Sequence, residues 1–580
     1  LQTRTAKRTP WSAVKTAVDM ANEGLISRAD ALLRVEAEEI SRLLVPQFSG
    51  DLSGTALADR FLARGAPASP GAASGTVCLD AIKAAEMAAD GEAVVLVRPE
   101  TKPDDIHGIT AAAGVVTSRG GVTSHAAVVT RGLGKPCIVG CEGIQVDLDA
   151  RLFMAGDKTV REGELISMDG SSGSVYLGEL DTVQTSVKDL PEAHELLRWA
   201  DETRRLGVMA NADTPLDARK ALTMGAEGIG LCRTEHMFLD PKRLPSVRQM
   251  LLNAEAAETW RQENDDRVFL VEKEPDAPQS VKDFYEALEE VKELQTGDFG
   301  GILKVMGPRP VIIRLLDAPL HEFLPPYETL LSELLELRHS GAAQADTEAK
   351  EAFLHLVDSL RESNPMLGHR GCRLGLSFPT IYRMQVEAII TAGALLVKEG
   401  LDVNPEIMIP LTVDVEEMHR LREDLSLVAS QVQERHSTKV HYMFGTMIET
   451  PRAALTAGEI AKESEFFSFG TNDLTQLAFG FSRDDAEGKF LRSYIDEGIL
   501  LRDPFASIDP EGVGALVKIG VEAGRRERPN LEIGICGEHG GDPASVVFCH
   551  EAGLDYVSCS PFRVPVARLA AAQAALTENY

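Results

Sequence analysis

The most constraining feature of this sequence is a series of short apolar segments with β-type composition, which begins after about residue 205 and alternates with longer stretches of helical periodicity. Strands separated by helices are typical of parallel β/α units. Eight units spread over roughly 375 residues match the number and approximate size expected of a closed (β/α)8 barrel with insertions. The eight segments are LGVMAN, GIGLCR, VIIRLLD, EIMIPL, VHYMFGTMIE, FFSFG, EIGICG and DYVSCS.

A doubly wound open sheet is the alternative for such a pattern. We favour the barrel because ionisable residues follow the carboxyl ends of many different segments, where the active sites of barrels collect. One long spacer, residues 239–308, separates the second and third segments. The spacer contains an acidic, polar stretch around residues 261–280, and we interpret the whole spacer as a solvated surface excursion.

The barrel is expected at residues 205–580. The chain before it divides, by amino-acid composition and periodicity, into three parts. Residues 1–58 include helical periodicity over 11–45, which predicts two short helices that form a connector. Residues 59–180 carry glycine-rich turns between short Val/Ile runs, such as EAVVLVRPE, and predict a compact β-rich mixed domain. Residues 181–204 are rich in Glu and Leu and predict a helical linker. The overall fold class is therefore α/β.

Charge and composition limit the partners. With 59 Lys and Arg against 89 Asp and Glu the net charge is -30, so phosphate backbones are repelled and we expect no nucleic acid partner. An anionic substrate would need a local cationic pocket. The 8 cysteines form no C-x-x-C pair, which indicates free thiols in a reducing compartment. The absence of a signal peptide and of an apolar run of membrane-spanning length predicts a cytoplasmic protein with no membrane partner, although an organellar location stays open.

Four arginines follow barrel segments. Arg233 ends the second segment, GIGLCR, and Arg314 lies within the third, VIIRLLD. Arg370 and Arg373 come from NPMLGHRGCR. Guanidinium groups match the planar geometry of phosphate and carboxylate oxygens. Taken singly, each arginine is explained as well by a surface ion pair. Three or four at one barrel mouth predict an anion-binding site.

Two carboxylates follow the fifth and sixth segments. Glu449 lies in GTMIETPRA and Asp473 in GTNDLTQ, one β/α unit apart, so both can face one ion above the barrel. Two carboxylates that leave room for substrate oxygens and water are typical of Mg²⁺ sites. Helix capping is the alternative, particularly for Asp473. The neighbouring Asn472 adds a neutral donor for a substrate oxygen.

Two thiols end the last strands. Cys536 lies in the glycine-rich segment GICGEHGG and Cys559 ends the eighth strand. Either thiol could deliver a proton to a carbon centre, and either could be a small buried apolar residue. Chemistry alone does not separate the two.

His125 follows the turn Gly-Gly-Val-Thr-Ser and begins an apolar run that reads as a helix. The N-terminus of a helix stabilises anions, and a neutral imidazole is nucleophilic near neutral pH. This position is suited to a phosphohistidine. A turn histidine that makes a local hydrogen bond is the alternative.

Together these segments resemble the pyruvate, phosphate dikinase family over nearly the whole chain. The segment GGVTSHAAVVTRGLGKPCIVG resembles the phosphohistidine region of that family. Six further segments resemble its barrel motifs and occur in the same order: GIGLCRTEHMF, RLLDAPLHEFLP, NPMLGHRGCRLG, GTMIETPRA, SFGTNDLTQ and GICGEHGGDPASV.

The resemblance implies a role for each candidate. His125 would carry a phosphoryl group on a swivelling domain between two remote active sites. In the barrel, the resemblance implies that Cys536, rather than Cys559, gives a proton to the enolate carbon, and that Asp317 supports the site. Arg233, Arg314 and Arg370 would hold phosphoenolpyruvate (PEP). Glu449 and Asp473 would bind Mg²⁺. Asn472 and Asp473 would position the substrate.

The resemblance also has limits. The family's amino-terminal ATP-grasp domain is absent except for LQTRTAKR, in which Gln2 and Arg4 would occupy nucleotide-contacting positions. We therefore expect this chain to perform the PEP/pyruvate half-reaction, while ATP, AMP, phosphate and diphosphate are handled by the missing domain. In plant members a threonine two positions before the histidine is phosphorylated, and Thr123 occupies that position. A homodimer formed through the barrel is implied.

Three related readings remain. PEP synthase (pyruvate, water dikinase) shares the histidine and barrel modules but uses water as the second acceptor. Enzyme I of the sugar phosphotransferase system would require a carrier-docking domain, which we do not find in the sequence. A catalytically silent scaffold would be expected to lose some of the histidine, arginines, carboxylates or thiol. The segment DPFASIDPEGVG and the LQTR remnant favour the dikinase.

Overall fold

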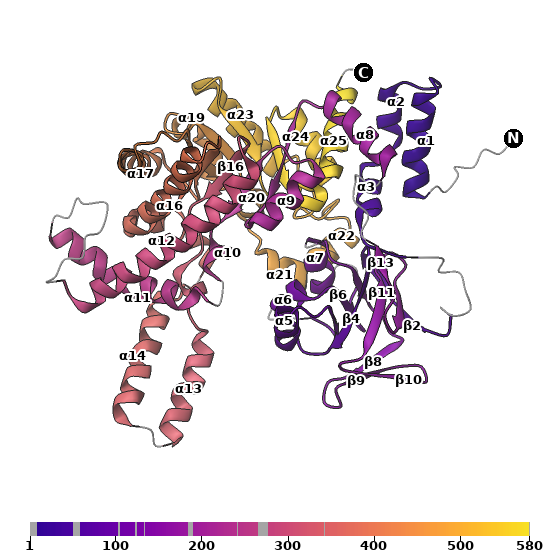
Figure 1. The fold of residues 1–580 in the computed structure, drawn as a ribbon, viewed down its shortest axis with the longest axis horizontal. Helices are drawn as coiled ribbons and strands as arrows, with labels where there is room; N and C mark the ends of the chain where they lie inside the picture. Colours follow the sequence, from indigo (N-terminus) through magenta and orange to yellow (C-terminus); the bar gives the residue numbers. More distant parts are fainter. Residues whose placement is uncertain are drawn as a thin grey trace.

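The computed structural model describes residues 9–49, 58–101, 105–121, 124–132, 134–183, 190–239, 242–264, 277–340, 343–362 and 364–578. Gln2, Arg4 and Thr123 lie outside these ranges. Figure 1 shows a barrel with its surrounding helices, a separate β-rich domain beneath it, and a helical arm that projects from the barrel.

The eight predicted segments all form strands, and these close into a parallel barrel in chain order. The α/β prediction with a (β/α)8 barrel is confirmed, and the open sheet is excluded. The strands are β14 (Gly207–Asn211), β15 (Ile229–Arg233), β16 (Pro310–Arg314), β17 (Asn404–Ile409), β18 (Met443–Ile448), β19 (Phe466–Phe469), β20 (Glu532–Ile535) and β21 (Tyr556–Cys559).

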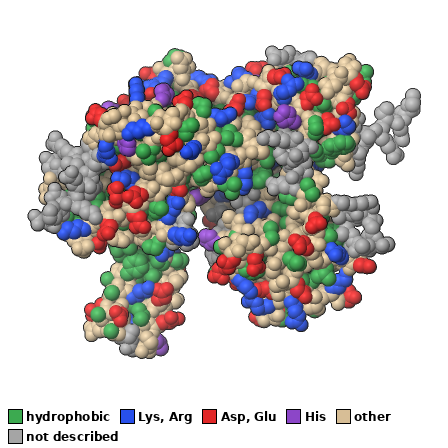
Figure 2. Space-filling view, viewed as in Figure 1, with side chains coloured by type: hydrophobic (Ala, Val, Ile, Leu, Met, Phe, Trp, Pro, Cys, Tyr) green, Lys and Arg blue, Asp and Glu red, His purple; other side chains and the backbone are tan. Residues whose placement is uncertain are grey.

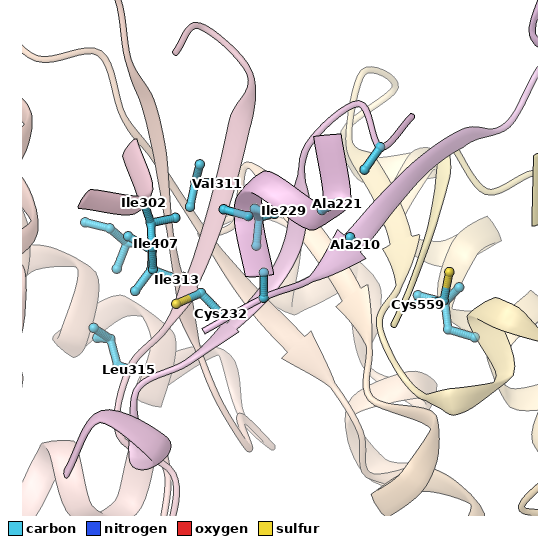
Figure 3. Packing of buried hydrophobic residues seen from close by; sticks show 14 of the residues in the cluster. Ala210, Ala221, Ile229, Cys232, Ile302, Val311, Ile313, Leu315, Ile407 and Cys559 are labelled. Atoms are coloured by element: carbon cyan, nitrogen blue, oxygen red, sulfur yellow. The ribbon is translucent and has the colours of Figure 1, made fainter. Parts of the chain in front are cut away.

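Successive residues of each strand point to opposite faces, so the barrel has two separate cores. Outward-facing side chains such as Ile229, Ile313 and Ile407 pack against the surrounding helices, as Figure 3 shows. The inward-facing side chains form a smaller cluster inside the barrel: Met209, Leu231, Ile312, Met408, Met447, Phe466, Cys536 and Tyr556.

Helices and short 3-10 turns follow the strands, and most of them cover the barrel. They are α9 (Pro215–Met224), α10 (Glu235–Phe238), α11 (Leu244–Glu263), α12 (Gln279–Met306), η3 (Leu320–Phe323), α13 (Tyr327–Ser340), α14 (Gln344–Leu360), η4 (Pro365–Leu367), α15 (Cys372–Ser377), α16 (Pro379–Lys398), α17 (Val415–His436), α18 (Pro451–Leu455), α19 (Ala457–Ile460), α20 (Thr471–Phe479), α21 (Arg483–Lys489), α22 (Leu491–Asp496), α23 (Val513–Glu527), η5 (Glu538–Gly541), α24 (Pro543–Glu551), η6 (Pro561–Arg563) and α25 (Val564–Thr577).

The spacer between the second and third strands differs from the predicted surface excursion. Two long helices, α11 and α12, occupy most of it and pack on each other and on α16. They bury Met250, Phe284 and Phe299 in the outer core. The polar stretch led us to overlook these apolar positions at helical spacing. Residues 265–276 lie outside the described ranges.

Among the described residues, α16 is long and apolar enough to cross a membrane, which the sequence reasoning did not anticipate. Its most apolar window is 78% buried inside the protein. The helix lies between α12 and α17, so its apolar character is explained by its place in the core.

The connector contains three helices rather than the two predicted, and these and the linker helix pack onto the barrel and share its outer core. Lys15 bonds Glu192 at 2.8 Å, and Arg563 bonds Glu38 at 2.7 Å. Gln573 of α25 donates to the carbonyl oxygens of residues 32 and 35 at 2.8 and 2.7 Å. The helices are α1 (Pro10–Asn22), α2 (Arg28–Arg34), α3 (Ala37–Leu44) and α8 (Pro191–Thr203).

The β-rich domain contains an eight-stranded mixed sheet in the order β2-β12-β11-β4-β5-β6-β7-β3 and a three-stranded sheet in the order β10-β9-β8. Three helices, α5 (Ala81–Ala89), α6 (Ile106–Ala111) and α7 (His125–Gly132), belong to this domain. The strands are β2 (Phe61–Arg64), β3 (Ala66–Ser69), β4 (Ala72–Cys78), β5 (Val94–Arg98), β6 (Gly114–Thr117), β7 (Cys137–Val139), β8 (Ile144–Asp147), β9 (Leu152–Ala155), β10 (Lys158–Arg161), β11 (Leu165–Asp169) and β12 (Ser174–Leu177).

The chain enters and leaves this domain through one antiparallel strand pair. β1 (Gln47–Phe48) pairs with β13 (Thr182–Val183). The domain also approaches the barrel beyond α7, where a Cβ atom placed on Gly134 would lie 3.1 Å from the Phe562 ring.

The arm is formed by the antiparallel helices α13 and α14. Its own small core contains Leu330, Leu334, Leu354 and Val357. Figure 2 shows further apolar side chains near the base of the arm.

Candidate active site

Arg233 and Arg314 are the last residues of the neighbouring strands β15 and β16, and their Cα atoms are register partners. The parallel strands therefore place both side chains at the carboxyl-terminal mouth of the barrel. Arg370 reaches the same place from the loop between η4 and α15, since it bonds Asp317, which lies three residues beyond Arg314.

Arg314 is fixed between two carboxylates. Its Nη2 donates to Glu235 Oε1 at 2.9 Å, and its Nη1 lies 2.9 Å from Asp317 Oδ2. Burial opposes the charge, yet Glu235 and Asp317 raise the pKa of Arg314 well above its usual value. The guanidinium is therefore a fixed cation whose orientation is set before any ligand arrives.

Arg370 is fixed in a similar way. Its Nε and Nη2 donate to the Asp317 carboxylate at 3.0 and 2.7 Å, and its Nη1 donates to Asp473 Oδ1 at 3.2 Å. Burial opposes ionisation of Asp317, but Arg314 and Arg370 hold the pKa of this carboxyl below its usual value. Asp317 thus joins the two arginines as a shared anion.

Arg233 and Arg373 differ from this pair. Among the described residues, the half-buried Arg233 guanidinium has no hydrogen bond or ion pair, while the backbone N–H of Arg233 donates to Asp213 at 2.6 Å. Arg373 Nη1 donates to the carbonyl oxygens of Leu367 and Gly368 at 3.0 and 2.7 Å. Arg373 therefore stabilises the loop that contains Leu367 and Gly368. Arg233, Arg314 and Arg370 remain as candidates for binding an anion.

Glu449 directly follows β18 and is fully buried. Its Oε1 accepts the N–H of Leu411 at 2.8 Å, and its Oε2 has no partner among the described residues. Leu411 has a φ of 60°, a left-handed conformation that non-glycine residues seldom adopt and that is found at functional sites. A Cβ atom on Gly470 would lie 2.5 Å from Glu449 Oε2, so the glycine leaves room for the carboxylate.

Asp473 and Asn472 lie in the first turn of α20. Burial raises the pKa of Glu449 well above its usual value, and Asp473 raises it further. Burial also raises the pKa of Asp473, although Arg370 opposes this shift.

These two carboxylates fit a divalent cation. A cation would remove their mutual repulsion and bind the unpartnered Glu449 Oε2. The described residues contain no group of three or more His, Cys, Asp or Glu arranged to hold a metal. A metal here would need ligands from substrate and water.

The structure distinguishes the two thiols that sequence reasoning left open. Cys536 belongs to the inward-facing cluster. The positive charges of Arg314 and Arg233 lower the pKa of its thiol, against the larger effect of burial. Cys559 belongs to the outer core, where burial raises its pKa to about 12 (Figure 3). Burial also raises the pKa of Cys536, so this thiol retains its proton at neutral pH.

His125 is the first residue of α7, and its side chain lies outside what the structure describes. The preceding turn includes Gly120 with a φ of 100°, and the N–H of Ser124 donates to the Gly121 carbonyl at 2.9 Å. Ser124 thus leads directly into the helix that begins at His125, as the sequence predicts.

Sequence reasoning missed Glu235, which is 7% exposed and bonds both Arg314 and the N–H of Asp317. Its position directly after Arg233-Thr234 was the available signal. An acid in the first turn of a helix is common, however, and this made Glu235 unremarkable by sequence alone.

Comparison with known proteins agrees with this geometry. Residues 188–576 match the family model described as PEP-utilising enzyme, PEP-binding domain. Residues 90–173 match the model described as PEP-utilising enzyme, mobile domain.

Curated relatives are similar over almost the whole chain. The pyruvate, phosphate dikinase of Clostridium symbiosum is 48% identical over 100% of this chain and 62% of its own length. Pyruvate, phosphate dikinase 2 of Oryza sativa subsp. japonica is 48% identical over 99% of this chain and 61% of its own length. The chloroplastic pyruvate, phosphate dikinase 1 of Arabidopsis thaliana is 49% identical over 99% of this chain and 56% of its own length. The chain thus spans about three fifths of the length of these relatives.

Proposed function

This chain belongs to the PEP-utilising enzymes, and from this premise we propose that it performs the PEP/pyruvate half-reaction of a pyruvate, phosphate dikinase. The observation that carries the proposal is the barrel mouth, where two carboxylate-fixed arginines lie beside the buried, unpartnered Glu449 Oε2. This arrangement fits an anionic substrate bound together with a divalent cation.

The arginines bind the substrate anions. Arg314 and Arg370 are already oriented by Asp317, so they contribute without the entropy cost of ordering long side chains. Arg233, whose guanidinium has no partner within the described part of the chain, would move onto the phosphoryl group of PEP when the substrate arrives. Asn472 donates to a substrate oxygen from the first turn of α20.

Glu449 and Asp473 would hold Mg²⁺ together with substrate oxygens and water. When bound there, the cation would supply electrostatic stabilisation of negative charge on a substrate oxygen. Burial raises the pKa of both carboxyls, and Asp473 raises that of Glu449 further, so a bound cation would favour their ionised forms.

Cys536 donates its proton to C3 of the enolate, and the product is pyruvate. Because burial keeps the thiol protonated, the proton is available when the enolate forms. His125 receives the phosphoryl group in line, and the N-terminus of α7 stabilises the phosphohistidine.

The remaining steps of a pyruvate, phosphate dikinase reaction would require a nucleotide-binding domain. ATP and phosphate would meet the phosphohistidine in a nucleotide-binding domain, with release of AMP and diphosphate. The phosphohistidine would travel on the β-rich domain between the two sites. A homodimer formed through the barrel is part of this proposal.

Intact mass tests the proposal directly. After incubation with PEP and Mg²⁺, the chain should gain one acid-labile phosphoryl group of about 80 Da, and a His125→Ala variant should gain none. The second variant, Cys536→Ser, should bind Mg²⁺-oxalate but release pyruvate slowly. No mass gain in a sample that binds Mg²⁺-oxalate would refute the proposed half-reaction for this chain.

A further inference from the structure

One strained backbone position lies between the arginines and the carboxylates of the barrel mouth. In the described part of the chain, three non-glycine residues have a positive φ: Arg151, Leu411 and Ser437. Arg151 and Ser437 are exposed, in a turn and at the end of α17, whereas Leu411 is 2% exposed and follows β17. A left-handed residue with a Cβ atom persists only where its surroundings hold it. Leu411 therefore needs contacts that fix its backbone.

The first of these contacts come from Cys372, which is 0% exposed and lies two residues after Arg370. Its backbone N–H donates to the Pro410 carbonyl at 3.0 Å, and its thiol donates to the Leu411 carbonyl at 3.2 Å. These carbonyls belong to the two peptide groups that flank the Leu411 Cα atom. Because φ and ψ describe the rotation of these two groups, Cys372 restrains both dihedral angles of the strained residue.

Gly371 allows this close approach. It has a φ of 61°, and a Cβ atom placed on it would lie 2.7 Å from Leu411 Cβ. The same atom would lie 3.0 Å from Asp317 Oδ1, the carboxylate that fixes Arg314 and Arg370. The loop that carries Arg370 therefore contacts the strained residue and the shared anion at one point.

Strand β18 holds the same segment from the other side. Thr446 Oγ1 donates to the Ile409 carbonyl at 2.8 Å and lies 2.7 Å from Thr412 Oγ1. Three residues further along the chain, Glu449 Oε1 accepts the Leu411 N–H at 2.8 Å. The backbone is thus fixed just before, at and just after Leu411.

The peptide group between Pro410 and Leu411 connects Cys372 to Glu449. Its carbonyl accepts the Cys372 N–H, and its N–H donates to Glu449 Oε1. The C=O and N–H of a trans peptide point in opposite directions, so one bond orients the other. Within the described residues, Glu449 Oε2 has no partner, so Oε1 serves the backbone while Oε2 is left for a ligand.

We propose that Cys372 is a positioning residue for the candidate metal ligand Glu449. Its thiol holds Leu411 in the left-handed conformation, which keeps the Leu411 N–H on Glu449 Oε1 and leaves Oε2 free for a divalent cation. This inference rests on the proposed function, to which the cation belongs. Cys372 acts through Leu411, and its thiol keeps its proton throughout.

The test compares substitutions that remove or keep the hydrogen-bond donor. Cys372→Ala removes the thiol, and Cys372→Ser replaces it with a hydroxyl donor. Cys549→Ala, at a fully buried cysteine of α24 in the outer core, is the matched control for loss of a buried thiol. Calorimetry would measure Mg²⁺ affinity at saturating oxalate, and urea unfolding without Mg²⁺ would measure stability.

We expect Cys372→Ala to bind Mg²⁺ roughly tenfold more weakly, as is typical when the partner that orients a metal ligand is lost. Cys372→Ser should stay within about threefold of the parent, because its hydroxyl can donate to the same carbonyl. Cys549→Ala should lose stability but keep the parent affinity for Mg²⁺.

Relief of the strain supplies a second test. Glycine adopts a positive φ without being held, so adding Leu411→Gly to Cys372→Ala should recover most of the lost Mg²⁺ affinity. Adding Ser437→Gly instead relieves an exposed left-handed residue far along the chain from the site, and should raise stability without recovering affinity. The comparison of Cys372→Ala with Cys372→Ser decides the matter if the Leu411→Gly double variant unfolds.

Three results would overturn the positioning role alone: parent affinity for Mg²⁺ in Cys372→Ala, an equal loss of affinity in Cys549→Ala, or equal recovery by the two glycine substitutions. A folded parent chain that binds no Mg²⁺ in the presence of oxalate would overturn the proposed metal site, and the role of Cys372 with it.

Discussion

Arg233 and Arg314 occupy matching positions at the ends of neighbouring strands but are held differently, and this predicts different effects of their substitution. Arg314→Gln would leave Glu235 buried without its cation and Asp317 with Arg370 as its remaining cation, which costs about 3–5 kcal/mol of folding stability. Arg233→Gln removes no ion pair and should change stability by less than about 0.5 kcal/mol. Both should abolish binding of Mg²⁺-oxalate.

Urea unfolding and oxalate titration would measure the two effects separately. Arg420→Gln, which removes only an exposed contact with Glu416, serves as the control and should leave both quantities unchanged. Equal destabilisation by Arg233→Gln and Arg314→Gln would contradict the difference that we assign to them.

At the residue scale, the sequence predicts position where a polar group ends an apolar strand. Arg233 and Arg314 lie at the barrel mouth as expected, because a barrel brings the carboxyl ends of all its strands to one mouth, and their role as substrate ligands stays a prediction. Glu235 was missed, because an acidic residue in the first turn of a helix is common and gives no sign of the arginine that it contacts.

At the scale of elements, the imidazole of His539 makes hydrogen bonds that connect three segments near the candidate site. His539 in η5 bonds Thr471, the first residue of α20, at 2.8 Å through Nδ1. Its Nε2 bonds the carbonyl of Pro504, which precedes α23, at 2.9 Å. A neutral ring satisfies both contacts when Nε2–H donates to Pro504 and Nδ1 accepts from the hydroxyl. Asn472 and Asp473 directly follow Thr471, so this imidazole supports the candidate metal site.

Burial lowers the pKa of His539 below its usual 6.5. The neutral ring therefore contributes stability that is fully present above pH 6.5 and is lost as the pH falls through the lower folded-state pKa. His539→Gln removes this titration. We expect thermal unfolding midpoints measured at pH 7.5 and 5.5 to differ more in the parent than in the variant. An equal pH dependence in the two proteins would show that the imidazole does not remain neutral in the fold.

The elements differ in how far the sequence reveals them. All eight barrel strands were predicted, because each is a short apolar run bounded by helical segments. The strand order of the β-rich domain was not predicted, because β4 pairs with β11 and β5, and the first of these partners lies almost 90 residues away in the chain. Such pairing depends on contacts that local periodicity does not encode.

At the scale of the whole molecule, the β-rich domain reaches the barrel at the loop that follows α7. Gly134 has a φ of 65° and leaves space for the Phe562 ring, which belongs to η6 beyond β21. Burial lowers the pKa of the adjacent Lys135, and the positive charge of Lys220 on α9 lowers it further, so these two like charges repel each other between the domain and the barrel. The first residue of α7 is His125, and this contact therefore influences where the phosphohistidine candidate lies relative to the barrel.

Phe562→Ser should weaken this contact and increase the population in which the β-rich domain has moved away. All eight native cysteines are buried, so dyes attached to cysteines introduced at the exposed positions Leu148 and Leu427 should label those sites selectively. In single-molecule energy transfer we expect one dominant distance in the parent and a second population in Phe562→Ser. Leu395→Ser, at a 45% exposed position on α16, is the control and should match the parent.

Because PEP must meet His125 at the barrel mouth, the Phe562→Ser variant should also be phosphorylated more slowly at unchanged oxalate affinity. An unaltered distance distribution would mean that the β1–β13 pair, rather than the Phe562 contact, sets the position of the domain.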